Sequence, residues 1–414
     1  MRNGDGSAVV IGASMAGLSA ARVLSERFGS VTVLDRDTLP DDGKPRRGVP
    51  QGAHGHILLV SGLRELAALF PGLEEELVAA GGTRFDTGLG LCTYRYGGRW
   101  FPAPTGLGLV SMSRPRLEAI VRDRVAKLPS VTIRDQVAVA ALAGTQAGMT
   151  GVVLDTGETL PADLVVDCSG RGSRSDRWLS EFGFPAPEQL EIKIGVTYST
   201  RLYRRRPDDL PDWTAIFTLP APPHEKWFGI ALPLEDDRWL VGLGGWHVDS
   251  PPDDAASFEA AALSLPDPIL ADLMARVEPL TDPLTYRFPS SRRRLFEKLD
   301  RLPAGYLALG DAICSFNPIY GQGMTCAAKE AVALGAALDR HDRADAGMAR
   351  EYYRAAAELI GTPWQFAWAA TSPTRRPRVR VRAASSWPTG TPAGSRSRRR
   401  STRTSTPLSS ACSS

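Results

Sequence analysis

A glycine-rich turn between two short apolar runs constrains the fold of this chain more than any other feature. Residues 8–11 (AVVI) are apolar, GASMAG follows at 12–17, LSAARVLSERFG shows helical spacing, and VTVLD at 31–35 is a second apolar run. This order predicts a strand, a tight turn, a helix and a second, parallel strand. Buried parallel strands belong to α/β folds with helices packed on the sheet. We therefore expect a Rossmann-like domain at the amino-terminal end.

The residues of this turn are those of a dinucleotide-binding site. Gly12 permits the tight turn, Ser14 is small enough for close approach, and Gly17 lets helix and strand pack closely. Backbone N–H groups at the helix start then face a pyrophosphate. Asp35 ends the second apolar run, where it can accept hydrogen bonds from a ribose. The expected cofactor contacts here are Gly12, Ser14, Met15, Ala16, Gly17 and Asp35; they do not separate NAD from FAD.

A second motif, GDAICSFNPIYGQGM at 310–324, follows the apolar run YLALG and precedes a helix-like stretch. A flavin extends far from its adenosine and needs such a second site, whereas a nicotinamide does not. Asp311 would hold the ribityl hydroxyls or the pyrophosphate side, and Pro318 would turn the chain beside the isoalloxazine. Negative charge collects on a reduced flavin, and a helix N-terminus favours negative charge. FAD is therefore the expected cofactor, with further contacts from Gly310, Asp311, Pro318, Gly321, Gly323 and Met324.

Together these motifs resemble the FAD-dependent monooxygenases of the para-hydroxybenzoate hydroxylase fold. More narrowly, the chain looks like the bacterial squalene-epoxidase-like enzymes, which include epoxidases of polyether polyketide pathways. The likeness covers roughly residues 7–365. It is carried by VVIGASMAGLSAARVL, RRGVPQGAHGHILL, SRPRLEAIVRDRV, DLVVDCSGRGSRS, RRRLFEKLDRLPAGYLALGDA and FNPIYGQGM, of which the last two are the most specific.

The resemblance implies roles for residues outside the two glycine motifs. Arg36 would lie with Asp35 at the ribose, and Arg114, at a helix start, matches an arginine that contacts FAD. Arg46 or Arg47 would reach the flavin edge, unless both are solvated loop arginines. The family's middle motif, Ala-Asp-Gly with a later Ser, falls on Cys168, Ser169, Gly170 and Ser173. Because Ser169 replaces the acid, the role of that acid does not transfer directly.

The resemblance also implies the reaction. NADPH or NADH, or a partner flavin reductase, would reduce FAD, and O2 would give a flavin C4a-hydroperoxide that epoxidises an alkene or hydroxylates an activated carbon. The protein would position a hydrophobic polyketide or terpenoid intermediate of secondary metabolism, such as antibiotic biosynthesis, and exclude water; no general base is assigned. The alternatives are an isoprenoid reductase, a non-catalytic flavin-binding protein, or a flavin-dependent halogenase. The halogenase Trp-x-Trp-x-Ile-Pro signature is matched in KWFGIALP only by Trp227, since Gly229 occupies the second Trp position.

The fold class expected for the whole chain is α/β, with an antiparallel substrate sheet inserted into the FAD domain. Strand-like runs fill 190–246, and EDDR at 235–238 and DTGE at 155–158 indicate hairpin turns. Helices are expected at roughly 55–70, 114–128, 323–340 and 346–360, with two short ones between 254 and 276. The predicted divisions are an FAD-binding part at 1–185, a substrate domain at 186–285, a second FAD-binding part at 286–365, and a tail at 371–414.

Composition excludes several function classes. The tail holds ten arginines and no lysine, aspartate or glutamate. The positive charge of these arginines exceeds the formal net charge of +3 of the whole chain, so the rest of the chain is net negative. No nucleic-acid partner is therefore expected. The tail itself should be disordered, either as a basic arm or as an out-of-frame read that replaces the usual carboxyl terminus. No apolar run is long enough for a membrane span, and five scattered cysteines without CxxC spacing predict a cytoplasmic protein with neither disulfides nor a zinc site.

Histidines and aromatic residues leave two interpretations open. His54 and His56 flank Gly55, and because residues two apart do not face one another on a helix, capping or packing is favoured over metal binding. No metal is expected. The aromatic residues of the strand-like region would pack the sheet or line a substrate pocket: Trp227, Phe228, Trp239 and Trp246.

Overall fold

The parallel sheet predicted at the amino-terminal end is present. The computed structural model describes residues 6–220, 225, 227–246, 250–370 and 379–382. Five parallel strands pair in the order β17-β11-β1-β2-β7. They are Ser7–Ile11 (β1), Ser30–Leu34 (β2), Val131–Arg134 (β7), Leu164–Asp167 (β11) and Tyr306–Ala308 (β17). The α/β fold class expected from the sequence is confirmed.

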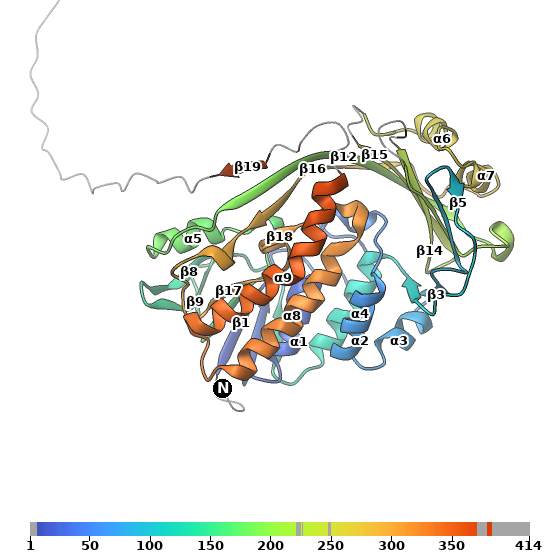
Figure 1. Ribbon diagram of the computed structural model, residues 1–414. Helices are drawn as coiled ribbons and strands as arrows, with labels where there is room; N and C mark the ends of the chain where they lie inside the picture. The colour runs from blue at the N-terminus through green and yellow to red at the C-terminus, as the bar shows by residue number, and fades with distance from the viewer. Residues whose placement is uncertain (1–5, 221–224, 226, 247–249, 371–378, 383–414) are drawn as a thin grey trace, which may run out of the picture. The chain divides into compact units, whose positions relative to one another are not determined.

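Helices pack beside this sheet, and α8 lies against α1, α2 and α9 (Figure 1). The short apolar residues of α1 and α8, mostly alanine and glycine, allow this close packing. Ser113 caps α4 by accepting a hydrogen bond from the Arg116 N–H, with Pro115 in the first turn. The helices of this part are Met15–Leu24 (α1), Val60–Leu69 (α2), Leu73–Ala79 (α3), Arg114–Ala126 (α4), Ser175–Glu181 (α5), Gln322–Arg340 (α8) and Ala346–Ala370 (α9).

A second, larger sheet contains nine strands, and most of its pairs are antiparallel as expected. Its order is β18-β16-β12-β15-β14-β13-β4-β5, with β19 beside β12. The strands are Leu91–Arg95 (β4), Gly98–Arg99 (β5), Gln189–Arg204 (β12), Ala215–Thr218 (β13), Trp227–Leu234 (β14), Arg238–Trp246 (β15), Leu284–Arg294 (β16), Cys314–Ser315 (β18) and Val379–Arg382 (β19).

This sheet departs from the expected substrate domain in two respects. β4, β5, most of β16 and β18 lie outside 186–285, so the sheet draws strands from the flanking segments as well. In addition, β4 pairs with β13 in parallel. The described residues form one compact unit. The divisions at 185 and 285 remain predictions.

The two faces of the larger sheet have different surroundings. Alternate residues of a strand point to opposite faces, and on one face Tyr203, Trp239 and Val241 form a second hydrophobic core with α6 (Ala255–Leu263) and α7 (Ile269–Met274). The opposite face carries Tyr198, Thr200 and their neighbours on β14, β15 and β16. The first, larger core surrounds the parallel sheet.

The remaining elements agree with the predicted hairpins. Residues 155–158 (DTGE) join Gly148–Leu154 (β9) to Thr159–Pro161 (β10), and Val139–Thr145 (β8) completes that small sheet. Residues 235–237 turn β14 into β15, with left-handed backbone at Asp236 and Asp237. Thr83–Asp86 (β3) and Gly108–Ser111 (β6) form a separate pair. Within the described residues, no helix combines the length and apolarity that a membrane crossing requires.

The prediction of a disordered tail falls mostly outside the described residues, namely on 371–378 and 383–414. The four tail residues that the structure describes form a strand, in contrast to the predicted disorder. Val379–Arg382 form β19, which pairs antiparallel with Gln189–Ile192 at the start of β12. The alternation of valine and arginine in VRVR suits a strand with one apolar and one polar face.

Candidate functional site

The first glycine motif forms a close turn between β1 and α1. Gly12 has φ +105°, and a Cβ atom there would lie 2.6 Å from the carbonyl oxygen of Cys168. A Cβ atom on Gly17 would lie 1.8 Å from the carbonyl oxygen of Gly12. Both positions therefore require glycine. Ser14 is the N-cap residue of α1, and its side chain does not cap the helix. Backbone N–H groups at this helix start thus remain for an anionic ligand.

The glycines of all three predicted motifs converge beside this turn. A Cβ atom on Gly310 would lie 2.8 Å from the Cβ of Ala16, which joins the Gly-Asp motif to the first motif. A Cβ atom on Gly323 would lie 3.8 Å from Asp311 Oδ1, and one on Gly170 would lie 4.0 Å from Asp311 Cβ. Asp311 is therefore surrounded by positions that lack side chains. Such bare backbone allows a large ligand to approach closely.

Asp311 has the properties of a ligand-binding carboxyl group. Burial raises its pKa to about 6, while the guanidinium groups of Arg171 and Arg114 act in the opposite direction. No hydrogen bond to its side chain is found among the described residues. The carboxyl group of Asp311 is half-buried and open to a ligand, and ribityl hydroxyls would supply hydrogen-bond donors to it. This observation fits FAD.

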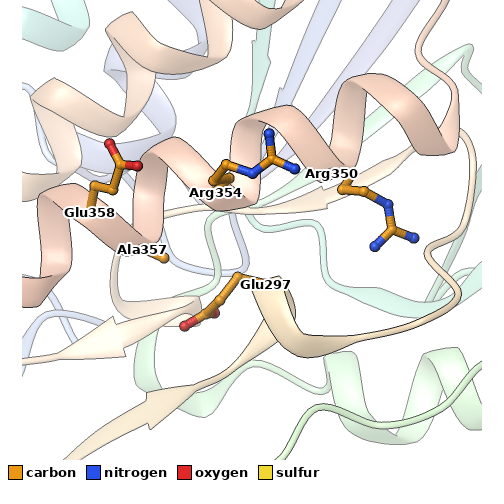
Figure 2. A pocket seen from close by; sticks show the side chains of 5 residues that line it. All are labelled: Glu297, Arg350, Arg354, Ala357 and Glu358. Atoms are coloured by element: carbon orange, nitrogen blue, oxygen red, sulfur yellow. The ribbon is translucent and has the colours of Figure 1, made fainter.

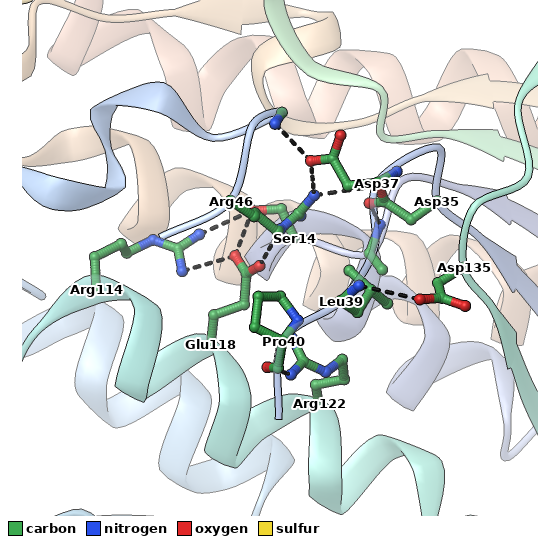
Figure 3. Close-up of polar contacts among 12 residues, drawn as sticks. Ser14, Asp35, Asp37, Leu39, Pro40, Arg46, Arg114, Glu118, Arg122 and Asp135 are labelled. Carbon is green, nitrogen blue, oxygen red and sulfur yellow. Dashed lines mark hydrogen bonds and ion pairs between the residues drawn. The ribbon is translucent and has the colours of Figure 1, made fainter. Parts of the chain in front are cut away.

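Beside the first motif, a buried polar network links the turn to α4 (Figure 3). Arg114 donates to Ser14 Oγ at 2.8 Å, and Ser14 donates to Glu118 Oε2 at 2.8 Å. Arg114 also pairs with Glu118 at 2.8 Å, and so does Arg46. Burial raises the pKa of Glu118, but the two arginines outweigh it and the net pKa is lowered. The network places Arg114 and Ser14 together at the start of α1, as a phosphate site requires.

Asp35 follows β2, and most acceptor positions of its carboxylate are occupied by donors of the protein itself. Its Oδ2 accepts from the Ala13 N–H at 2.7 Å, and its Oδ1 accepts from the Asp37 N–H at 2.9 Å. Arg46 pairs with Oδ1 at 3.2 Å and with Asp37 Oδ2 at 2.9 Å. A carboxylate has about four acceptor positions, so little capacity remains for a ribose. Arg46 thus lies beside Asp35 and Asp37, and its predicted contact with the flavin edge stays a prediction.

The middle motif is organised by Asp167, which sequence reasoning did not select. This carboxylate ends β11, is fully buried, and accepts hydrogen bonds from the Ser169 N–H and the hydroxyls of Ser169, Ser173 and Ser175. Tyr306 donates to it as well, at 3.1 Å. The acid of this motif therefore sits one residue before Cys168. It fixes the turn that carries Gly170, so a serine at position 169 is compatible with the motif.

On the far side of the Gly-Asp motif, three rings meet the larger sheet. The ring of His54 lies 4.8 Å from that of Tyr198 and 5.6 Å from that of Tyr286, between centroids. His54 Nδ1 is 2.9 Å from Thr200 Oγ1. The packing role expected for His54 is present, but its partners are residues of β12 and β16. Sequence spacing gives no signal for contacts across 146 residues.

The other predicted residues are distributed as follows. Arg36 and Arg47 are exposed to solvent. Pro318 is exposed and begins a single helical turn (Pro318–Tyr320), after which Gly321 has φ +61° at the start of α8. Met324 lines a small cavity with Arg114 and His56. Met15 is buried in the core and Ala16 packs against it.

Three of the four aromatic side chains are described, and they lie on both faces of the larger sheet. Trp239 is buried in the second core and donates from Nε1 to Asp209 at 3.0 Å, and Trp227 packs against the same core. Phe228 points to the opposite face, where its ring would meet a Cβ atom on Gly244. The side chain of Trp246 lies outside the described residues.

A surface cavity of about 360 Å³ lies apart from these motifs (Figure 2). It is lined by Arg350, Arg354, Ala357 and Glu358 of α9 and by Glu297. Its two arginines and two glutamates carry balanced charge. None of the residues predicted to bind a cofactor lines it, so it is not the candidate site.

Comparisons with known proteins agree with this arrangement. The chain matches no family model. It is 36% identical over 375 residues to Protein Rv3254 of Mycobacterium tuberculosis, and the match covers 86% of this chain and 78% of that protein.

Solved structures give the fold. PqsL of Pseudomonas aeruginosa, described as a probable FAD-dependent monooxygenase, superimposes with a TM-score of 0.65 at 20% identity and covers 90% of this chain and 98% of its own. The myxobacterial FAD-dependent halogenase CndH gives 0.67 at 17% identity, covering 89% and 82%. A variant of the flavin-dependent brominase Bmp2 gives 0.67 at 18%, covering 88% and 87%. The chain therefore has the fold that FAD-dependent monooxygenases and flavin-dependent halogenases share.

Proposed function

The chain belongs to the family of Protein Rv3254 of Mycobacterium tuberculosis, and from this premise we propose that it is an FAD-dependent monooxygenase. The observation that carries the proposal is the surrounding of Asp311, a half-buried carboxyl group without a hydrogen-bond donor among the described residues. It is bordered by Gly170 and Gly323, and the neighbouring Gly310 lies against Ala16 of the first motif. An FAD molecule laid across the motifs would place its pyrophosphate at the start of α1 and its ribityl chain at Asp311.

When bound, the flavin supplies the oxygen chemistry, because it can be reduced and can then react with O2. The protein's own residues bind and orient. Ser14 and Arg114 would hold the pyrophosphate side and Asp311 would hold the ribityl hydroxyls. The N-terminus of α8 would favour negative charge near the ring. The sheet face that carries Tyr198 would exclude water from the site.

The finer proposal concerns substrate and electron donor. We propose that the substrate is a hydrophobic alkene-bearing polyketide or terpenoid of secondary metabolism, epoxidised or hydroxylated according to the carbon it offers. The face opposite the second core supports this, since Phe228, Ile230 and Leu232 lie on it. NADPH or NADH, or a partner flavin reductase, would supply the electrons. The fold is shared with halogenases, but no residue in the described part of the chain favours halogenation over oxygen transfer.

The test begins with the absorption spectrum of the purified protein and the identity of the cofactor released on denaturation. We expect non-covalent FAD. With NADPH or NADH and ¹⁸O2, an isoprenoid alkene such as squalene should gain one labelled oxygen atom. A flavin reductase is added in a parallel reaction to distinguish the two routes of electron supply.

Two glycine variants provide the matched comparison. Gly17→Ala should abolish FAD retention, because its methyl group would overlap the backbone of Gly12. Gly361→Ala, on α9 with nothing within 4 Å of the added atom, should retain FAD. A wild-type protein that neither contains FAD nor takes it up when FAD is added would contradict the proposed function.

A further inference from the structure

Three rings gather where the Gly-Asp motif meets the larger sheet: His54 from the loop before α2, Tyr198 from β12 and Tyr286 from β16. The centroids of the two tyrosine rings are 5.4 Å apart, and His54 meets Tyr198 edge to face. His54 is 2% exposed, whereas both tyrosines are only partly buried. The two tyrosine rings therefore keep part of their surface open beside the buried His54 ring.

Several polar atoms of these rings have no hydrogen-bond partner within the described residues. His54 uses Nδ1 with Thr200, and within the described residues neither its Nε2 nor the two tyrosine hydroxyls have a hydrogen-bond partner. Both tyrosines are only partly buried, so their two hydroxyls and the free ring nitrogen of His54 are open to a ligand that supplies a hydrogen-bond partner.

All three side chains are neutral at physiological pH. Burial lowers the pKa of His54 to about 4 and raises the pKa values of both Tyr198 and Tyr286. The hydroxyls are thus O–H donors. The cation of Arg171 interacts electrostatically with Tyr286, but its guanidinium is held by Ser290 and Ser315 through hydrogen bonds of 2.5–2.7 Å.

The position of the cluster links it to the cofactor site. Tyr286 interacts electrostatically with Asp311 of the Gly-Asp motif. Three residues after His54, the carbonyl oxygen of Ile57 lies 3.3 Å from the Cβ position of Gly321. Gly55 contacts Ile230 and Leu240 on the sheet face. The cluster therefore lies between the flavin motif and an apolar wall.

We propose that His54, Tyr198 and Tyr286 form a substrate anchor that binds an uncharged acceptor oxygen, such as a carbonyl or ether. The proposal rests on the proposed function and narrows its substrate class to apolar molecules that carry such an oxygen near the reacting carbon. The tyrosine hydroxyls donate to the oxygen, and the neutral His54 ring orients Tyr198 and Tyr286. The apolar wall takes the hydrocarbon part.

Tyr203 provides a control for the proposed anchor within the same chain. Tyr203 lies on the same strand as Tyr198 but on the opposite face, and within the described residues its buried hydroxyl has no hydrogen-bond partner. It is 2% exposed in the second core and has no access to the anchor. Removal of its hydroxyl should therefore leave ligand recognition unchanged.

The test is titration calorimetry with two probes, geranylacetone and the hydrocarbon in which a methylene group replaces its carbonyl. We expect the wild-type protein to bind the ketone about tenfold more tightly, because the hydrogen bonds to the oxygen have no counterpart in the hydrocarbon. The double variant Tyr198→Phe/Tyr286→Phe should bind both probes equally. Tyr203→Phe should keep the preference.

Each outcome decides the proposal. A wild-type protein that binds the two probes equally, or binds neither, would overturn the anchor, and so would a double variant that keeps the preference. The FAD content of the same samples, read from their absorption, tests the proposed function separately. A ketone preference in a protein without FAD would uphold the anchor while contradicting the monooxygenase.

Discussion

The carboxyl group of Glu330 accepts a hydrogen bond at 2.7 Å from the backbone N–H of Gly310, which ties α8 to the Gly-Asp motif. Glu330 is fully buried, and its other oxygen has no partner among the described residues. Burial raises its pKa to about 8, although the Gly310 N–H acts to lower it. At pH 7 the folded protein therefore holds a proton at this site.

This proton makes stability depend on pH. Between pH 4.5 and about 8 the unfolded chain ionises Glu330 while the folded chain keeps it protonated, so the free energy of unfolding should decrease as the pH rises. Glu330→Gln keeps an acceptor for Gly310 and removes the titration. We expect urea unfolding at pH 5 and pH 8 to show a smaller decrease for this variant. Equal decreases in both proteins would contradict the assignment.

A second prediction compares two acids on α4. Glu118 is 4% exposed and holds both Arg46 and Arg114. Glu118→Ala leaves two buried guanidinium groups without their shared partner and should lower the free energy of unfolding by about 3 kcal/mol. Asp123→Ala removes an exposed pair with Lys127 on the same helix and should change stability little. Urea unfolding of both variants checks this, and similar losses would contradict it.

A third prediction concerns the pH dependence of FAD binding. If ribityl hydroxyls donate to the ionised Asp311 carboxylate, affinity should be full above its pKa of about 6 and should decrease as the pH falls below that value. Asp311→Asn should weaken binding about tenfold at pH 7.5, since hydrogen bonds to a charged group are the stronger ones, and should remove the pH dependence. Flavin fluorescence quenching measures both. The exposed Asp272→Asn variant is the control, and an unchanged pH profile in Asp311→Asn would exclude the role.

Local sequence signals predicted the parallel part of the fold well. Apolar runs bounded by glycine predicted β1, α1 and β2, and the apolar spacing after Ser113 predicted α4. The helix expected at roughly 55–70 begins only at Val60. Residues 55–59 instead form a loop against Gly321 and the larger sheet. A short apolar run such as HILLV does not distinguish these states, because the deciding contacts are tertiary.

The candidate site was predictable where backbone geometry demands a residue type. A side chain at Gly12, Gly17 or Gly310 would collide with the neighbouring segment. The spacing of the glycines in the sequence therefore predicts these positions. No comparable sequence pattern predicts Asp167 or the cluster around His54. Their partners are ordinary serines and tyrosines, brought together by strand pairing over long sequence distances, so only the folded chain reveals their relationship.

The order β17-β11-β1 also has a consequence for biosynthesis. The glycine turn after β1 leaves the ribosome early, but its neighbours in the sheet are Leu164–Asp167 and Tyr306–Ala308, and the start of α8 comes later still. Closing such long loops is slow and must precede the contacts that stabilise them. If the chain binds FAD as proposed, the nascent chain can hold the nucleotide and ring ends of that cofactor together only after most of the chain has been translated.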